Sequence, residues 1–230
     1  MTPETEQNTF SPAKVAALIP AYREAAHIRE VVQRVRAQLE NVLVVDDGSP
    51  DNTAELARQA GAEVIVHAQN AGKGAAIKTG FKALLERGFD YVLILDGDGQ
   101  HLPEEIQHFL SAATATPCGL FVGNRMHKTD GMPLVRLLTN RFMSCLISWL
   151  CRQPIPDTQC GFRMIHRNVI PSLYCESNAY DYETEMLFIA SRDGHRIGNV
   201  PVSTVYGSET SKIHPLRDGI RFAKLMTRYW

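Results

Sequence analysis

The stretch that decides the fold is Tyr91-Val-Leu-Ile-Leu-Asp-Gly-Asp-Gly-Gln-His101. It begins with apolar residues that do not alternate with polar ones, as in a strand buried on both faces of a parallel sheet. Asp96 and Asp98 follow at once, and Gly97 and Gly99 let the backbone bend closely around them. Two such carboxylates can share one divalent cation, but an Asp-Gly turn at a strand end explains this segment alone equally well.

The same alternation of elements continues on both sides of this stretch. Further apolar runs predict buried strands, at 15–19, 42–45, 64–66 and 120–122. Helical patterns separate them, at 25–39, 53–60, 75–87 and 103–113. Strands that alternate with helices predict a mainly parallel sheet, in which ligands bind beyond the carboxyl ends of the strands. The candidate site is therefore expected in the polar segments 20–24, 46–49, 96–100 and 123–125.

The second half of the chain is less regular, but no linker divides it from the first. We expect helices at 134–151 and 182–191, strands at 162–165 and 197–205, and a last amphipathic helix at 215–230. The apolar face of the helix at 134–150 is interpreted as part of the core. Residues 1–12 are polar and predict a flexible tail, which leaves 13–230 as a single domain.

Size and composition exclude several classes of protein. The chain has 230 residues, 44% of them hydrophobic, which suffices for one sizeable core. Its formal net charge of −1 argues against a nucleic-acid-binding protein. The five cysteines include no Cys-x-x-Cys pair, which argues against a zinc site and a disulfide framework. With no signal peptide, and with Arg136 and Arg141 inside its most apolar stretch, the chain is expected to be cytoplasmic.

Two further motifs each allow a structural and a functional reading. In Asp46-Asp-Gly-Ser-Pro-Asp51 a carboxylate can accept hydrogen bonds from a base or ribose, while Asp51 or Asn52 can cap the next helix. Asn70-Ala-Gly-Lys-Gly74 lacks the spacing of a Walker loop. We interpret it as a tight turn, with a phosphate contact at the helix start as the alternative.

Four motifs, taken together and in this order, resemble the family 2 glycosyltransferases of the GT-A fold. They are Ile19-Pro-Ala-Tyr-Arg-Glu24, Val45-Asp-Asp-Gly-Ser-Pro-Asp51, Asp96-Gly-Asp-Gly-Gln-His101 and Asp157-Thr-Gln-Cys-Gly-Phe-Arg163. The chain is most similar to the dolichyl-phosphate mannose synthase type, which includes bacterial polyprenyl-phosphate sugar transferases. The likeness runs from about Val15 to Lys212. It implies an α/β fold with a mainly parallel central sheet flanked by helices.

On the donor side, the resemblance implies a role for each matching residue. The residues that match nucleoside-holding positions are Pro20, Tyr22, Glu24 and Asp46. The Asp96-Gly97-Asp98 loop matches the site of the donor diphosphate and of a Mg²⁺ or Mn²⁺ ion, with Gln100 as a further metal contact. Ser211 and Lys212 match a pair on a mobile loop over the donor phosphates. Arg23 departs from the pattern, because the family usually has asparagine there.

On the acceptor side, Arg125 matches an arginine that meets the sugar or the acceptor phosphate, and Asp157 and Arg163 match an acceptor motif. A phosphate acceptor is already an anion, so Arg125 and Arg163 would position it without a strong base. A hydroxyl acceptor needs a base, and Asp157 is then the candidate. The alternative role of Asp157 is to brace the loop at Gly161. Members of the family often carry acids at positions 181, 183 and 185, which a helix start would also favour.

The implied reaction is the inverting transfer of a sugar from a UDP- or GDP-sugar to a polyprenyl or dolichyl phosphate. The expected catalytic residues are Arg125, Asp157 and Lys212. Two alternatives stay open, namely a soluble or saccharide hydroxyl as acceptor, and a non-catalytic nucleotide-binding protein. The basic residues along 215–230 fit a peripheral contact with the cytoplasmic face of a membrane, or ordinary packing on the core. The oligomeric state is not predicted.

Overall fold

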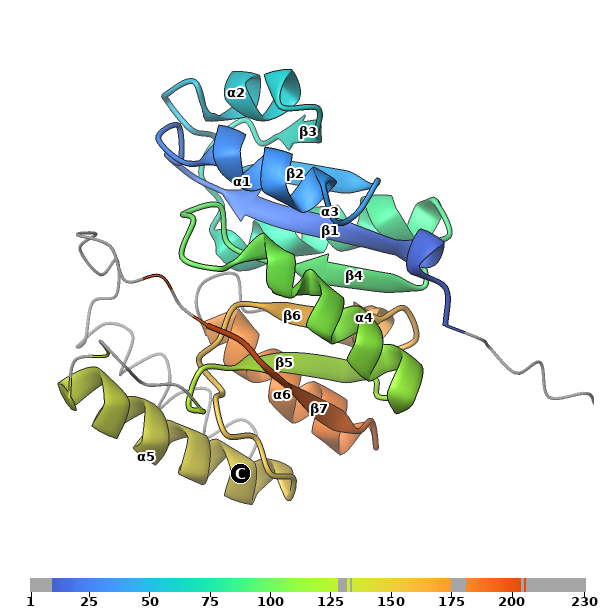
Figure 1. Cartoon of the computed structure of the whole chain (residues 1–230), viewed down its shortest axis with the longest axis vertical. Coiled ribbons are helices and arrows are strands. Elements are labelled where there is room, and N and C mark those ends of the chain that lie inside the picture. The colour runs from blue at the N-terminus through green and yellow to red at the C-terminus, as the bar shows by residue number, and fades with distance from the viewer. Residues whose placement is uncertain (1–9, 128–131, 133, 175–180, 204, 206–230) are drawn as a thin grey trace, which may run out of the picture.

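A computed structural model describes residues 10–127, 132, 134–174, 181–203 and 205 (Figure 1). The predictions for Ser211, Lys212 and the helix at 215–230 lie outside these residues. The same holds for residues 1–9 of the expected tail. Phe10 is described, and the centre of its ring lies 5.4 Å from that of Tyr91.

A seven-stranded sheet forms the centre of the described residues, in the order β3-β2-β1-β4-β6-β5-β7. The strands are β1 (Val15–Ala21), β2 (Val42–Asp46), β3 (Glu63–Val66), β4 (Tyr91–Ile94), β5 (Leu120–Asn124), β6 (Arg163–His166) and β7 (Ile197–Pro201). Neighbours pair in parallel except at β6, which is antiparallel to both β4 and β5. The expected mainly parallel sheet is confirmed.

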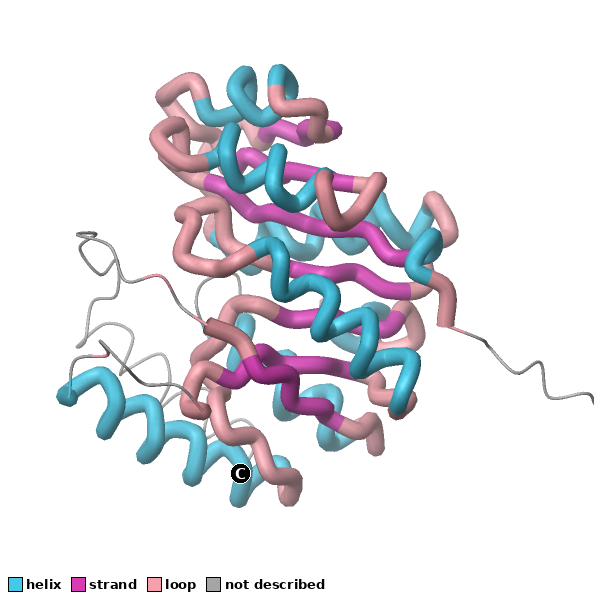
Figure 2. The backbone as a smooth tube through the Cα atoms, in the orientation of Figure 1, coloured by secondary structure: helices cyan, strands magenta, loops and turns pink. Residues whose placement is uncertain are grey.

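Helices cover both faces of this sheet (Figure 2). They are α1 (Ile28–Arg36), α2 (Thr53–Gln59), α3 (Lys73–Glu86), α4 (Ile106–Ala115), α5 (Leu134–Cys151) and α6 (Asp181–Arg192), with 3-10 turns at Pro12–Lys14, Pro103–Glu105 and Ile170–Leu173. In Figure 1, α1 and α4 lie in front of the sheet, whereas α3 and α6 lie behind it. α2 packs against α1 and β3 at one end of the molecule, and α5 packs against α6 at the other.

The core forms where the apolar strands meet one face of each covering helix. β1, β2 and β4 are buried along their whole length, as apolar runs without alternation predict. In α1 the buried side chains are Ile28, Val31, Val32 and Val35, whereas its charged residues face outward. Burying each such side chain contributes about 1.5–3 kcal/mol, so this face holds α1 on the sheet.

Several element boundaries differ from the sequence prediction, and two of these differences have local causes. α1 begins later than expected, because a turn precedes it in which the amide of Ile28 donates to the carbonyl of Glu24 at 2.9 Å. The last described strand ends at Pro201, earlier than expected. Beyond Pro201, the amide of Ser203 donates to the carboxylate of Glu105 at 2.9 Å. The chain therefore no longer pairs with β5 at this point.

α5 points its apolar face away from the core. Its exposed large apolar side chains are Leu134 (68%), Val135 (78%), Leu138 (57%), Phe142 (68%) and Trp149 (63%). Its buried side carries mainly small or polar residues, namely Asn140, Ser144, Ile147 and Cys151. The interpretation of the apolar face as core holds only for Ile147, with Met143 and Leu150 packed beside it. It is wrong for the exposed residues, because α5 packs on α6 outside the sheet. Among the described residues, no helix combines the length and the hydropathy that crossing a bilayer requires.

Candidate functional site

Backbone amides tie the loop after β1 to the loop after β2. The amide of Arg23 donates to Oγ of Ser49 and the amide of Glu24 to Oγ1 of Thr53, both at 2.9 Å. Arg23 has a φ of 58°, in the left-handed region that asparagine tolerates better than arginine. The asparagine that the family usually has here therefore suits this turn. The two loops form one surface, as the predicted nucleoside site requires.

The neighbouring carboxylates Asp46 and Asp47 are both buried but have different partners. Asp47 accepts hydrogen bonds from the amides of Ala71 (2.9 Å) and Gly72 (2.7 Å), so it fixes the turn that precedes α3. Asp46 accepts hydrogen bonds from the hydroxyl and the amide of Ser49, the latter at 3.1 Å. Of the two, Asp46 is thus the one that holds Ser49, the residue that joins the two loops, and its predicted nucleoside contact lies on this side.

The loop after β4 lies beside the loop after β1. A β-carbon placed on Gly97 would be 3.5 Å from Cγ of Glu24, so these two predicted donor residues are neighbours. Asp98 accepts a hydrogen bond from the amide of Gln100 at 3.0 Å, which bends the segment after β4 into a compact turn. The structure therefore brings the predicted nucleoside and metal residues to the same edge of the sheet.

Lys73, in the first turn of α3, joins Asp96 to Glu183 of α6. Its Nζ lies 2.6 Å from Oδ1 of Asp96 and 3.1 Å from Oε1 of Glu183. The three side chains are largely buried, with exposed fractions of 17%, 27% and 15% in that order. Burial alone would lower the pKa of Lys73, but attraction to Asp96 and Glu183 outweighs it and raises that pKa. Lys73 is therefore charged, and Asp96 already holds a cation.

Gly161 lies directly against this ionic cluster. A β-carbon on Gly161 would be 2.7 Å from Oδ2 of Asp96 and 3.2 Å from Oε1 of Glu183. Only glycine permits so close an approach of the backbone to the two carboxylates. The loop before β6 and the loop after β4 thus meet at Asp96.

His101 lies on the other side of Asp96. Its Nε2 is 3.8 Å from Oδ2 of Asp96, and the centre of its ring is 5.1 Å from that of Phe162. Burial, with the positive charges of Arg125 and Lys73, lowers the pKa of His101 to about 4, so the imidazole is neutral at neutral pH. Among the described residues its Nδ1 has no hydrogen-bond partner. A bound group or a water molecule would satisfy this nitrogen.

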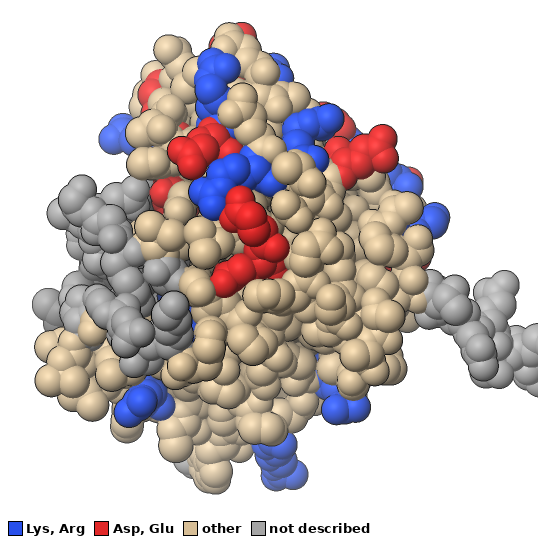
Figure 3. All heavy atoms as spheres, viewed as in Figure 1, with Lys and Arg blue, Asp and Glu red and all other residues tan. Residues whose placement is uncertain are grey.

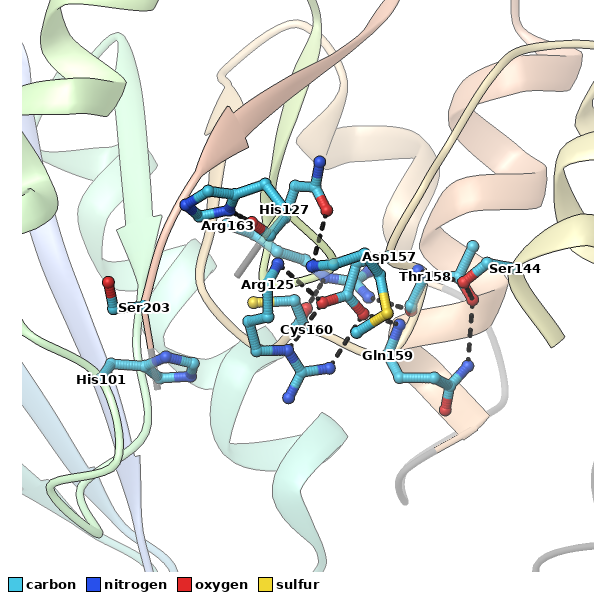
Figure 4. Close-up of polar contacts among 12 residues, drawn as sticks. His101, Arg125, His127, Ser144, Asp157, Thr158, Gln159, Cys160, Arg163 and Ser203 are labelled. Carbon is cyan, nitrogen blue, oxygen red and sulfur yellow. Dashed lines mark hydrogen bonds and ion pairs between the residues drawn. The ribbon is translucent and has the colours of Figure 1, made fainter. Parts of the chain in front are cut away.

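Arg125, directly after β5, is held by Asp157 (Figure 4). Its Nε and Nη2 donate to the two carboxylate oxygens at 2.7 and 2.9 Å, and its amide adds a bond of 3.1 Å. Asp157 is fully buried and Arg125 is 5% exposed. Because both oxygens of Asp157 are engaged, the geometry favours the bracing role over that of a general base.

Arg163 braces the loop before β6, which carries the predicted acceptor motif and which we call the acceptor loop, through backbone carbonyl groups. It donates to the carbonyls of Cys160 at 2.9 Å and Thr158 at 3.0 Å, and also to the carbonyl of Glu183. Its side chain is 1% exposed, and burial lowers the pKa of its guanidinium. The expected contact of Arg163 with an acceptor phosphate is therefore corrected, since its N–H groups hold this loop to α6.

The segment that follows β7 passes the predicted metal loop. The amide of Val205 donates to the carbonyl of Gln100 at 3.0 Å. The chain therefore leaves the described residues beside that loop, six and seven positions before the predicted pair Ser211 and Lys212.

The donor set suits a divalent cation that is shared with a ligand. Within the described ranges, no group of three or more His, Cys, Asp or Glu is placed to hold a metal ion by itself. Asp96 nevertheless holds an ammonium cation at 2.6 Å, and Asp98 and Gln100 add oxygen atoms in the same loop. Mg²⁺ and Mn²⁺ prefer oxygen ligands, and Mg²⁺ commonly completes its shell with water and substrate phosphates. The residues therefore fit such an ion.

Lys73 and Glu183 are the site residues that sequence interpretation missed. Lys73 lies in a motif that we interpreted as a turn, and Glu183 in a group of acids that a helix start explains. The two are 110 positions apart, so no local pattern connects them. The available signal was a lysine between two glycines at the start of an apolar helix, with no acid close to it in sequence.

Comparison with known proteins identifies relatives across most of the chain. The sequence model of glycosyl transferase family 2 matches residues 16–173. The UDP-N-acetylglucosamine–dolichyl-phosphate N-acetylglucosaminyltransferase of Methanococcus voltae is 31% identical over 82% of this chain and 84% of its own. The undecaprenyl-phosphate mannosyltransferase of Micrococcus luteus is 31% identical over 84% of each chain.

Solved structures share the fold at lower sequence identity. Glucosyl-3-phosphoglycerate synthase from Mycobacterium tuberculosis, in complex with UDP, superposes with a TM-score of 0.74 at 20% identity. The match covers 94% of this chain and 79% of that one. It confirms the predicted GT-A architecture.

Proposed function

Because the chain belongs to glycosyltransferase family 2, we propose that it transfers a sugar from a UDP- or GDP-sugar to a polyprenyl phosphate, with inversion and with a divalent metal ion. The relatives from M. voltae and M. luteus carry names that specify dolichyl-phosphate and undecaprenyl-phosphate transferases. The following paragraphs give what in this chain supports each part of the proposal.

The donor would bind across the loops that follow β1, β2 and β4. Glu24 and Asp46 belong to the surface that we assign to the nucleoside, together with Pro20 and Tyr22. Asp96, Asp98 and Gln100 would hold Mg²⁺ or Mn²⁺, which acts as a Lewis acid on the leaving diphosphate. The segment beyond Val205 starts beside Gln100, which supports the assignment of Ser211 and Lys212 to the donor phosphates.

The outward apolar face of α5 is the observation that carries the choice of a lipid acceptor. A polyprenyl phosphate lies in a membrane, so an enzyme that uses it has to meet the membrane near its site. The exposed residues recur every three or four positions, at Val135, Leu138, Phe142, Cys145 and Trp149. In Figure 3, the lower part of the view, where α5 lies, shows Lys and Arg side chains and no acidic ones. Such a surface suits anionic lipid headgroups.

The inner side of α5 reaches the loop that holds Arg125. Oγ of Ser144 accepts a hydrogen bond from the amide of Thr158 at 3.0 Å, and Thr158 follows Asp157 directly. Asp157 in turn fixes the guanidinium of Arg125. An acceptor phosphate that enters from the side of α5 would therefore meet an arginine that is already oriented. Asp157 would act as a positioning residue, and the acceptor anion would attack without a protein base.

We also propose a peripheral position on the cytoplasmic face of the membrane. The four described cysteines are free thiols, one of them the exposed Cys145, as is usual in a reducing compartment.

A transfer assay separates this proposal from its alternatives. The protein is incubated with Mn²⁺, labelled UDP- and GDP-sugars, and either a short-chain polyprenyl phosphate or a mixture of saccharides and phosphorylated hydroxy acids. Label that moves into the organic phase supports the lipid acceptor. Label found only on a water-soluble product refutes it and returns Asp157 to consideration as a base. A chain that binds no nucleotide in calorimetry with metal present would be neither kind of enzyme.

Vesicle flotation tests the membrane contact directly. Vesicles of phosphatidylcholine and phosphatidylglycerol should bind the protein, and Phe142→Ser with Trp149→Ser should weaken this binding by at least about tenfold, since each buried aromatic side chain contributes roughly 1.5–3 kcal/mol. Val66→Ser is the matched control, because Val66 is an exposed apolar residue on β3 at the opposite end of the sheet. Equal loss in both variants would contradict the assignment of α5.

A further inference from the structure

The ammonium group of Lys73 is paired with Asp96, one of the predicted metal ligands. Its Nζ bonds Asp96 at 2.6 Å and Glu183 at 3.1 Å. Two carboxylates this close together in largely buried surroundings repel each other unless a cation lies between them. A motif that resembled a simple turn therefore places a fixed positive charge in the donor site. The turn itself is fixed from outside by Asp47, so Lys73 is held in this position by the backbone that precedes it.

We propose that Lys73 is an internal cation of the donor site, which holds Asp96 and Glu183 together until a divalent ion replaces it at Asp96. The inference rests on the metal site of the proposed function. Mg²⁺ lies about 2.0–2.1 Å from its oxygen ligands, so a divalent ion of this size bound to Asp96 would come within a few ångströms of an ammonium group on the same carboxylate. The two cations repel each other strongly at such a distance. They therefore compete for Asp96.

Glu183 keeps the displaced ammonium group near the site. Once Nζ has left Asp96, Glu183 still attracts it. Gly161 limits the movement of Nζ on the other side, because a β-carbon placed on Gly161 would lie 3.3 Å from Nζ. The positive charge would then face whatever anion arrives with the metal. A nucleoside diphosphate supplies such an anion, so metal and nucleotide should bind better together than the metal binds alone.

Binding of Mn²⁺ without nucleotide measures this competition directly. Free Mn²⁺ gives an electron paramagnetic resonance signal that disappears on binding, so the affinity is read without any enzymatic activity. Lys73→Met removes the competing charge, and we expect it to tighten Mn²⁺ binding by roughly tenfold. Glu183→Gln leaves Asp96 as the main partner of Lys73, so it should weaken Mn²⁺ binding several-fold.

Two controls separate competition at Asp96 from a change in overall charge or in stability. Lys82→Met removes a positive charge from an exposed position on the same helix and should leave Mn²⁺ binding unchanged. Lys73→Arg keeps the charge and should keep the affinity close to that of the wild type. Circular dichroism and the melting temperature report on folding. If Lys73→Met does not fold, Lys73→Gln decides, because it removes the charge but keeps a hydrogen-bond donor for Asp96 and Glu183; an unchanged Mn²⁺ affinity in that variant refutes the competition.

The same measurements distinguish a wrong inference about Lys73 from a wrong assignment of the metal site. If Asp96→Asn abolishes Mn²⁺ binding but Lys73→Met does not tighten it, the competition is refuted and the metal site stands. If neither the wild type nor Lys73→Met binds Mn²⁺, both are refuted. The competition is established if Lys73→Met binds Mn²⁺ more tightly and Glu183→Gln binds it more weakly, while both controls keep the wild-type affinity.

Discussion

Helices α1 and α5 are both amphipathic, but they point their apolar faces in opposite directions. α1 buries Ile28 and Val35 against the sheet. α5 buries Ser144 beside the acceptor loop and exposes Phe142 and Trp149. The first half of the described chain thus carries the loops after β1, β2 and β4 on a closed core, whereas α5 in the second half packs its inner side against the loop that holds Arg125 and turns an apolar surface outward. This difference teaches that the outward face of α5 can be altered without touching the loops that we assign to the donor, although Lys73 and Glu183 join the two halves at Asp96.

The largest effect on sugar transfer is expected from a substitution in the loop after β4, which we assign to the metal ion. Asp98→Asn removes one carboxylate charge and nearly keeps the shape of the side chain, so sugar transfer should fall by about 10³-fold. The melting temperature should stay as in the wild type, because asparagine keeps an oxygen that can accept the hydrogen bond from the amide of Gln100. The binding to vesicles should also stay unchanged, because the substitution leaves α5 intact. Transfer that remains within tenfold of the wild type would mean that Asp98 is not a metal ligand.

A second variant tests the point where the two halves meet. Gly161→Ala would place a methyl group 2.7 Å from Oδ2 of Asp96, so either this carboxylate or the acceptor loop has to shift. A displacement of this size can lower kcat/KM by about 10²-fold. Steady-state kinetics with donor and acceptor varied in turn would show which half has moved. Unchanged kinetics would show that the loop before β6 has room to adjust.

A matched pair of valines compares the two helices for stability. Val35 of α1 is fully buried, and Val135 of α5 is 78% exposed. Val35→Ala should lower the free energy of unfolding by about 2 kcal/mol, from lost burial and the cavity that remains. Val135→Ala should change it by less than about 0.5 kcal/mol. Urea denaturation of the two variants checks this, and similar losses in both would mean that the outer face of α5 is covered by protein.

The smallest effect concerns one strained residue in each half. Arg23 and Arg152 have φ angles of 58° and 51°, in the left-handed region. Asn adopts this region more readily than arginine, so Arg23→Asn and Arg152→Asn should each stabilise the fold by about 0.5 kcal/mol. Thermal denaturation would detect a small rise in melting temperature. A fall in either variant would indicate that the arginine side chain makes a stabilising contact larger than the strain.

The fold of the first half could be predicted because strands buried on both faces leave continuous apolar runs, as at Tyr91–Ile94. The orientation of α5 could not, since its pattern shows an apolar face but not what covers it. In the site, Asp96 and Asp98 were predictable because they directly follow a strand. The contact of Lys73 with Glu183 joins α3 to α6 across 110 positions of the chain, which no local pattern encodes.

The position of β6 also sets the order in which the molecule can assemble. β6 lies between β4 and β5 in the sheet, although it follows both in the chain. While the chain is being synthesised, β5 therefore has neither of its neighbours, because β6 and β7 are both still to come. Until then β4 presents an open edge, which invites wrong pairing or capture by a chaperone. The donor loops can thus form on the ribosome well before Arg125 finds its place.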